Sequence, residues 1–502
     1  MATARLPDDP SFEQLRRQAK DLRDLSRAGL QGALDLVGAH HPDGPHAVSL
    51  AGAQFVVARH YGFSSWAALR QHVTTIERYR RVPDELAEVA AGRPADEFLM
   101  LACLRYGGDD APERWQRAAR LLAGHPEITR TSVHAAAAAA DADALAALLR
   151  QDPGLASAEG GPYRWEPILY LAHARHDPSI SEAAAVRAAR LLLDHGADPN
   201  AGYLWHGLIP AFTALTGALG SGEGDQPQHP QGPALARALL AAGADPNDGQ
   251  ALYNRQFGSD DSHLALLLSH GLGHGDGGPW RARLGRRTDS PAELIRGQLR
   301  WAVTHDMSDR VRLLADHGAD LRTPFEAGEE RLVRCVNASD NKTPAEVASV
   351  CGCWAVLDVL AGYGVPRPAA EGADGLIAAA LAGDRRTVER LAGHADAARA
   401  QRPGLIVWAA SRRAWDAVPL LAGLGWDVNA RARADFPIEQ EWETALHEAA
   451  AAGEIDAARM LIELGADPAA RDARFQATPL GWAEHFGQQA MAGFLRPLTP
   501  AE

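Results

Sequence analysis

Short apolar segments alternate with turn residues along most of the chain, and one motif recurs where an apolar segment ends. Neighbouring aliphatic residues are followed within a few positions by Gly and, in most copies, by Ala-Asp. The clearest copies are LLLDHGADPN (191–200), LLAAGADPN (239–247), LLADHGADL (313–321), LLAGLGWDVN (420–429) and LIELGADP (461–468). A glycine just past a helix supplies the left-handed backbone that ends it, so the pattern predicts many short helices closed by tight turns.

Weaker copies of the same motif fill the intervals. They are LLAGHPEI (121–128), LLRQDPGLAS (148–157), LLLSHGLG (266–273), VLAGYGV (359–365) and RLAGHAD (390–396). With a terminal unit at 476–496, the chain holds about eleven units of irregular length. The alanine-rich run at 134–149 fits an inner helix, a turn and an outer helix of one unit, so we do not interpret it as a linker.

The most regular stretch, 443–487, shows which family the unit resembles. Its diagnostic residues are Thr444, Leu446, His447, Ala449, Ala450, Gly453, Gly465, Asp467 and Pro468, followed by a new start at Thr478, Pro479 and Leu480. This stretch resembles the ankyrin repeat, a unit of about 33 residues built from a β-turn finger and two antiparallel helices. Thr444 and Thr478 stand where helix N-caps are needed, and Pro479 suits the first helical position. The resemblance implies that His447 hydrogen-bonds backbone within the turn.

The predicted fold is all-α: an ankyrin-repeat solenoid of about eleven irregular helix-turn-helix units, preceded by a small helical unit. We place the N-terminal unit at 1–80 and the repeat array at 81–502, with a hinge around Arg81. The first helix begins after Ser11 and carries Phe12, Leu15, Ala19, Leu22 and Leu25 on one face. Two further helices are broken at Gly62, and Ser64 or Ser65 caps the second. A similar segment precedes many bacterial ankyrin arrays, and it implies no activity.

Composition excludes several classes of protein. A chain of 502 residues is too long for one ordinary core, and its net charge of −14 argues against binding to nucleic-acid phosphates. There is no signal peptide and no uninterrupted apolar stretch of membrane-spanning length. Four cysteines make no disulfide framework. Lysine occurs only at Lys20 and Lys342, and alanine and glycine are abundant. This usage is typical of a bacterial genome with a high GC content. We therefore expect a bacterial, cytoplasmic protein without membrane or nucleic-acid partners.

Five insertions depart from the repeat pattern, at 160–167, 201–212 (followed by a loop at 220–233), 273–291, 322–344 and 430–442. Long insertions in repeat proteins lie on one face, often the binding face. The alternative is that they are flexible surface loops.

Aromatic residues define a candidate binding groove. When the inner helices are aligned, the position after the His447 slot holds Tyr170, Asn254, Trp301, Trp408 and Trp482 in five repeats. The fingers add Tyr163, Arg164, Trp165, Tyr203, Trp205, Phe325, Phe436 and Trp442. Aromatic and arginine side chains dominate binding hot spots, so this set predicts a groove for a protein or peptide. The alternative for each ring is packing between repeats.

Acidic residues cluster near the last fingers, at Asp435, Glu439, Glu441, Glu443 and Glu448. They favour a basic partner unless they form a solvated loop. No nucleotide-binding or nucleophile motif is present, and the histidine clusters match no metal-ligand motif, so we expect no cofactor and no metal.

Two hypotheses follow. The first is a non-enzymatic recognition scaffold that binds a protein or peptide in its concave groove. The second is a small-molecule-binding protein or enzyme with a pocket formed by the insertions between 160 and 276. Its candidate groups are Arg164, Glu166, His173, His206, Tyr253, Asn254 and Asp261, which would have to converge on one cavity.

Overall fold

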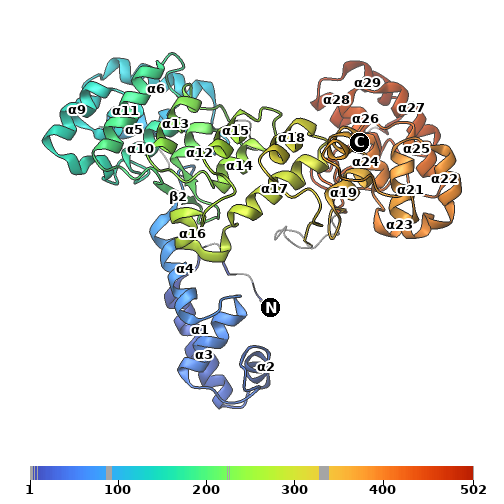
Figure 1. Cartoon of the computed structure of the whole chain (residues 1–502), viewed down its shortest axis with the longest axis horizontal. Coiled ribbons are helices and arrows are strands. Elements are labelled where there is room, and N and C mark those ends of the chain that lie inside the picture. Colours follow the sequence, from blue (N-terminus) through green and yellow to red (C-terminus); the bar gives the residue numbers. More distant parts are fainter. Residues whose placement is uncertain are drawn as a thin grey trace. The chain divides into compact units, whose positions relative to one another are not determined.

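The structure is a computed structural model, and it describes residues 4, 6–7, 9–85, 93–222, 224, 226–326 and 338–500. Contacts divide the chain into two compact units, Met1–Leu294 and Ile295–Glu502. Both units are mostly helical (Figure 1).

Unit 1 begins with four helices that share a core. They are α1 (Phe12–Arg27), α2 (Gln31–His40), α3 (Leu50–His60) and α4 (Trp66–Tyr79). Ser11 caps α1, and Ser65 rather than Ser64 caps α4, accepting a hydrogen bond from the N–H of Ala68 at 3.1 Å. The buried stripe of α1 continues from Leu22 to Ser26, four residues on, whereas Leu25 is 45% exposed. The predicted place of Leu25 on the buried face is therefore wrong.

A small sheet joins these helices to the rest of unit 1. Strand β1 (Arg80–Arg81) pairs in parallel with β2 (Gly202–Trp205), which pairs antiparallel with β3 (Phe212–Thr213). The insertion at 201–212 is therefore a hairpin, and the predicted hinge at Arg81 is part of a strand. Ile76, Leu204, Ala211 and Leu284 form a shared apolar cluster beside this sheet.

Paired helices follow through the remainder of unit 1. The pairs are α5 (Pro94–Ala102) with α6 (Pro112–Gly124), α8 (Val133–Ala138) with α9 (Ala142–Gln151), α10 (Pro167–His173) with α11 (Glu182–Asp194), α12 (Ala214–Leu219) with α13 (Gly232–Ala241), and α14 (Gly249–Arg255) followed by α15 (Ser262–Ser269). The alanines of α8 let α5 and α10 pack closely on either side. The alanine-rich run is thus a helix pair, as predicted.

Short elements fill the connections of unit 1. They are α7 (Ile128–Thr131), η1 (Pro153–Ser157), α16 (Gly278–Leu284) and η2 (Gly285–Arg287). Helix α17 (Pro291–Thr304) runs across the boundary between the two units.

Unit 2 continues with paired helices. They are α18 (Ser308–Asp316), α19 (Pro344–Cys351) with α20 (Trp354–Gly362), α21 (Gly372–Leu381) with α22 (Arg385–Leu391), η3 (Ala392–His394), α23 (Ala395–Gln401), α24 (Leu405–Ser411) with α25 (Ala417–Gly423), α26 (Ala445–Ala452) with α27 (Ile455–Glu463), and α28 (Pro479–His485) with α29 (Gln489–Leu495). Gly453 and Gly465 have positive φ of 72° and 100° just past α26 and α27, which is the backbone the sequence pattern requires there. Residues 327–337 of the fourth insertion lie outside the described residues.

One polar contact recurs between neighbouring turns. The side chain of Asn429 donates to the Gly465 carbonyl at 2.9 Å and accepts from the N–H of Asp467 at 2.8 Å. Asn200 makes the same two contacts with Gly243 and Asp245. Because each such Asn satisfies the backbone of the next helix end, it fixes the spacing between neighbouring units.

Candidate functional site

The candidate binding surface lies in unit 2, on two fingers and the inner helices that follow them. We call it the finger–helix face and define it by Asp435, Trp442, Glu443, Glu448, Phe475 and Trp482. The first finger connects α25 to α26, and the second connects α27 to α28. An isolated bridge between Ala432 and Glu443 closes the first finger, and the N–H of Ala473 donates to the Trp442 carbonyl at 2.7 Å, which ties the fingers together.

Arginine side chains and aromatic rings stack along this face. Trp442 is half-buried between the guanidinium groups of Arg433 and Arg474, which lie 4.0 and 3.9 Å from its ring centre. Arg474 also stacks on Phe475, whose side chain is 67% exposed. Such stacking presents a broad, amphipathic surface to a partner.

Asp472 holds the second finger in shape. Its carboxylate accepts hydrogen bonds from the N–H groups of Arg474, Phe475 and Ala477 at 2.8, 2.6 and 3.0 Å. It also accepts from Nε1 of Trp482 at 3.1 Å. One carboxylate therefore orients both the tip of the finger and the ring on the inner helix, so Phe475 and Trp482 are preorganised.

Two carboxyl groups of the face, the buried Glu443 and the half-buried Glu448, lie close to like charge. Burial raises the pKa of Glu448 to about 7, and nearby Asp435 adds to the effect. Burial also raises the pKa of Glu443 to about 7, with Glu448 and Asp435 contributing, although the Ala434 N–H donates to it at 2.7 Å. Within the described ranges, the Glu448 carboxylate has no hydrogen bond or ion pair. A cationic side chain from outside would relieve this repulsion.

Trp301 extends the face onto α17. Its ring stacks on His305 at 3.9 Å and on Phe436 at 5.8 Å. His305 lies with Nε2 2.8 Å from the Asp435 carbonyl, so the tip of the first finger is fastened to α17. Trp301, Trp442 and Trp482 are each half-buried, and part of each ring faces solvent.

Trp408 does not line a groove. It is 1% exposed, its Nε1 donates to the Cys351 carbonyl at 3.0 Å, and Arg412 stacks on it at 4.2 Å. The neighbouring Arg402, itself 1% exposed, forms an ion pair with Glu439 at 2.7 Å. Trp408 therefore packs between repeats, which was the alternative to lining a groove. Glu439 stabilises a finger through its ion pair with Arg402 and is not part of an acidic surface. Phe325 is buried in the same unit.

The aromatic residues of unit 1 that were expected to line a groove form a core. Tyr163, Trp165, Tyr170 and Tyr203 are each no more than 2% exposed. The Tyr170 hydroxyl donates to the Gly160 carbonyl at 2.8 Å, and the rings of Trp165 and Tyr203 stack at 4.8 Å. Ring packing on this scale stabilises the inserted fingers and leaves these faces closed to a protein partner.

A small pocket lies where the N-terminal helices meet this aromatic core. Its volume is about 60 Å³, and its charged lining comprises Arg78, Arg81, Glu159, Arg164, Glu166, Asp198 and Arg283. The rings of Tyr79, Trp165, Tyr203 and Trp280 also line it. Burial, with the neighbouring Asp198 and Glu159 carboxylates, raises the pKa of Glu166 to about 7. Oε2 of Glu166 is buried and receives no hydrogen bond from the described residues.

The predicted acid–base residues do not converge with Glu166. The ring of His173 is fully buried, and burial lowers its pKa to about 3. His206 lies 2.8 Å from Asp84, next to Trp205, whose Nε1 donates to the Arg105 carbonyl. Tyr253 is 40% exposed on α14, and Asp261 stands at the start of α15. Asn254 is buried and bonded to Gln250 at 2.8 Å. Only Glu166 and Arg164 of the proposed catalytic groups share the pocket, so no catalytic set is assembled there.

Several pocket residues were not anticipated from the sequence. Arg78 lies on α4 and Arg81 on β1, and Trp280 and Arg283 lie on α16. The pairing of β1 with β2 brings residues 80–81 next to 204–205, and no local pattern in the sequence predicts that pairing.

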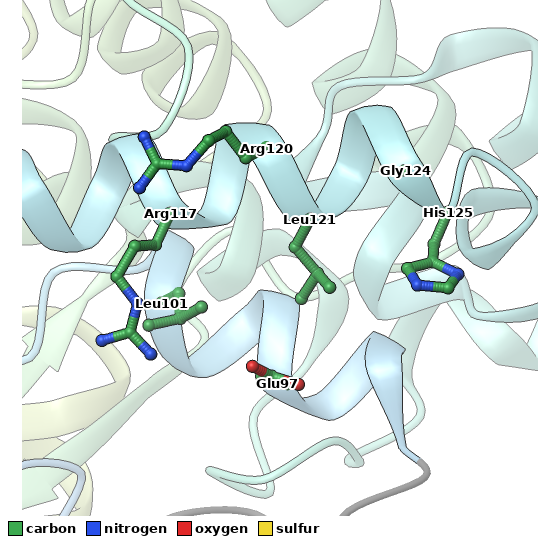
Figure 2. A pocket seen from close by; sticks show the side chains of 7 residues that line it. All are labelled: Glu97, Leu101, Arg117, Arg120, Leu121, Gly124 and His125. Atoms are coloured by element: carbon green, nitrogen blue, oxygen red, sulfur yellow. The ribbon is translucent and has the colours of Figure 1, made fainter.

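A second depression lies on the surface between α5 and α6 (Figure 2). It is open, with a volume of about 330 Å³. In Figure 2, Leu121 points between the helices, and Arg117 and Arg120 project from α6. Its lining is Glu97, Leu101, Arg117, Arg120, Leu121, Gly124 and His125. No sequence-predicted residue belongs to it, and nothing in it suggests chemistry.

The comparisons with known proteins identify the repeats of unit 2. Residues 376–472 match the family described as ankyrin repeats, in three copies. These copies run from α21 to the Asp472 finger and include Trp442, Glu443 and Glu448. Ankyrin repeats generally serve as protein-binding scaffolds. A search among curated proteins finds no match to the chain. Among the helices of the described residues, none is both long and apolar enough to cross a bilayer.

Proposed function

We propose that this protein is a recognition scaffold whose finger–helix face binds a basic segment of a protein partner. The observation that carries the proposal is Glu448, a half-buried carboxylate with no hydrogen bond or ion pair to the described residues. It lies near Glu443, whose other charged neighbour Arg474 stacks on the exposed ring of Phe475. An inserted Lys or Arg would neutralise Glu448 and Glu443, whereas Asp435 is already paired with Arg433 at 2.6 Å. An apolar neighbour would cover Phe475, Trp442 and Trp482. The partner is therefore a segment with a basic residue close to an aromatic or aliphatic one.

The wider architecture supports the same role. We propose that about eleven ankyrin-like units make up residues 81–502 and that residues 1–80 form a helical module of their own. The helix pairs before α21 support the extension, as does the recurrence of the Asn200 contacts at Asn429. The separate apolar core of the first four helices supports the module.

A displayed library of random peptides tests the proposal. We expect selection on the full chain to enrich peptides that combine Lys or Arg with an aromatic residue. Enriched peptides should lose about tenfold or more in affinity for the Glu448→Gln and Phe475→Ala variants, because each removes a central contact. Phe257→Ala, which truncates an exposed ring of unit 1, is the matched control. Peptides without basic residues, or equal binding to Glu448→Gln, would refute the proposal.

A small-molecule site is the second candidate function, and we place it at the pocket around Glu166. The observation that favours it is the convergence of Arg164, Arg283 and an unsatisfied Glu166 oxygen on one cavity. Native mass spectrometry of the purified chain tests it: a retained small ligand should be lost from the Arg164→Gln variant.

A further inference from the structure

We propose that the pocket around Glu166 binds hydrogen phosphate, an oxyanion that carries one proton. The inference rests on the second proposed function, that this pocket takes a small ligand. It names the class of that ligand from the charges, donors and size of the site.

The positive charge of the pocket is only partly used within the protein. Arg78 clamps both carboxylate oxygens of Glu159 at 3.0 and 2.5 Å, and Arg81 reaches the same carboxylate at 3.3 Å. Two other guanidinium groups of the pocket do not bind the Glu159 carboxylate. Arg164 is exposed and makes no side-chain hydrogen bond or ion pair to any residue in the described ranges. Arg283 lies 3.9 Å from Asp198 and rests on the Trp280 ring at 4.9 Å.

Guanidinium groups bind tetrahedral oxyanions through paired N–H donors, and aromatic faces hold the guanidinium plane in place. Arg164 is set at the tip of its finger by a left-handed backbone with φ of 54°. Its carbonyl accepts from Arg81 at 3.4 Å, which anchors the finger to the N-terminal helices. The arrangement is therefore held by the backbone and by neighbouring side chains before a ligand arrives.

Glu166 makes the pocket selective for an oxyanion that carries a proton over one that is fully deprotonated. Its buried Oε2 receives no hydrogen bond from the described residues, and a buried acceptor without a partner costs free energy until a donor reaches it. A fully deprotonated anion would only add repulsion from Glu166, Glu159 and Asp198. Hydrogen phosphate offers P–O⁻ groups to Arg164 and Arg283 and a P–OH donor to Glu166. The volume of about 60 Å³ is far below the roughly 300 Å³ or more of pockets that hold drug-sized ligands, so it suits a five-atom oxyanion better than a nucleotide.

Sulfate and methyl phosphate are the matched comparators. At about pH 8 the Glu166 carboxyl is mostly ionised, because its pKa is about 7. At that pH hydrogen phosphate keeps one hydroxyl, whereas the sulfate and methyl phosphate dianions have none. The charged groups that line the pocket with Glu166 are Arg78, Arg81, Glu159, Arg164, Asp198 and Arg283.

Isothermal titration of the full chain with each salt is the test. We expect one site for phosphate and binding of sulfate and methyl phosphate weaker by about tenfold or more. Arg164→Gln and Arg283→Gln should each weaken phosphate binding by about tenfold, whereas Arg237→Gln, at an exposed position on α13, should not. Glu166→Gln should bind sulfate more tightly and lose most of the preference for phosphate.

Equal affinity for phosphate and sulfate in the unmodified chain would overturn the inference, and so would the absence of phosphate binding. A different small ligand, retained on purification and lost in Arg164→Gln, would overturn the phosphate assignment and keep the small-molecule pocket. Circular dichroism of each variant checks that the fold is intact.

Discussion

Replacing Glu448 by Gln should stabilise the repeats around α26 and weaken partner binding at the same time. The substitution keeps the shape of the side chain and removes its charge. Burial and Asp435 raise the pKa of Glu448 from an ordinary value of 4.5 to about 7. The folded state therefore holds this proton more tightly than the unfolded state does.

The sign and size of the effect follow from that difference. Below about pH 4.5 the carboxyl is protonated in both states and costs nothing. Stability is lost as the pH rises toward 7, and the full penalty remains above it. A pKa difference of about 2.5, at about 1.4 kcal/mol for each unit, gives roughly 3.5 kcal/mol at most, and partial solvent screening reduces this to about 2 kcal/mol. Glu448→Gln should therefore be more stable than the unmodified chain at pH 8, but not at pH 4.5.

Hydrogen exchange across a urea series measures the local stability of α26, because a repeat array need not unfold in one step. The difference between the two proteins, compared at the two pH values, isolates Glu448 from other titrating groups. Glu463→Gln, at an exposed position of α27, should show no such dependence. A stability difference that is the same at both pH values would refute the argument that Glu448 is destabilised by burial and like charge.

Three further substitutions test how the fingers are held. Arg402→Met should cost about 3–5 kcal/mol in local unfolding, because it leaves the Glu439 carboxylate without its buried partner. The control Arg367→Met breaks an exposed ion pair with Asp358 and should cost less than about 1 kcal/mol. Equal costs would contradict the claim that the Arg402–Glu439 pair holds the finger. Asn429→Ala should cost about 0.5–1.5 kcal/mol in urea unfolding, because the exposed Gly465 carbonyl and Asp467 N–H then bond to water in place of their shared partner. A neutral effect would mean that these contacts do not couple the units. Asp472→Ala should speed amide hydrogen exchange at Arg474, Phe475 and Ala477, because their N–H groups lose the carboxylate that accepts from them. Exchange in α25 should remain unchanged. Protection retained at all three amides would contradict the role of this carboxylate.

The helix ends were predictable from the sequence because they depend on local chemistry. Gly465 needs no distant partner to end α27, and Thr478 caps α28 by accepting from the nearby Gly481 N–H at 3.3 Å. His447 lies 2.8 Å from Thr444 Oγ1 and 3.0 Å from the Ala477 carbonyl, and so has the structural role that the resemblance implied. The Asn429 contact also had a signal, because an Asn ends three of the repeated motifs, at 200, 247 and 429.

Ring exposure was not predictable from the repeat register. Trp408 and Trp482 occupy the same position of the inner helix, but Arg402 and Arg412 close over Trp408, whereas Trp482 stays half-exposed. Which of the two occurs depends on side chains from other segments. The residues that line the pocket were not predictable for the same reason. Arg81 reaches Glu159 only because β1 pairs with β2, a strand from a distant part of the chain.

The most direct test of the finger–helix face is photo-crosslinking in the source cell. A photoreactive phenylalanine analogue at position 475 is compared with one at position 257, which is also exposed. We expect the probe at 475, and not the probe at 257, to label one protein at a basic segment, and we expect this labelling to fall sharply when Glu448→Gln is added. Equal labelling at both positions, or labelling at 475 that Glu448→Gln leaves unchanged, would contradict the account.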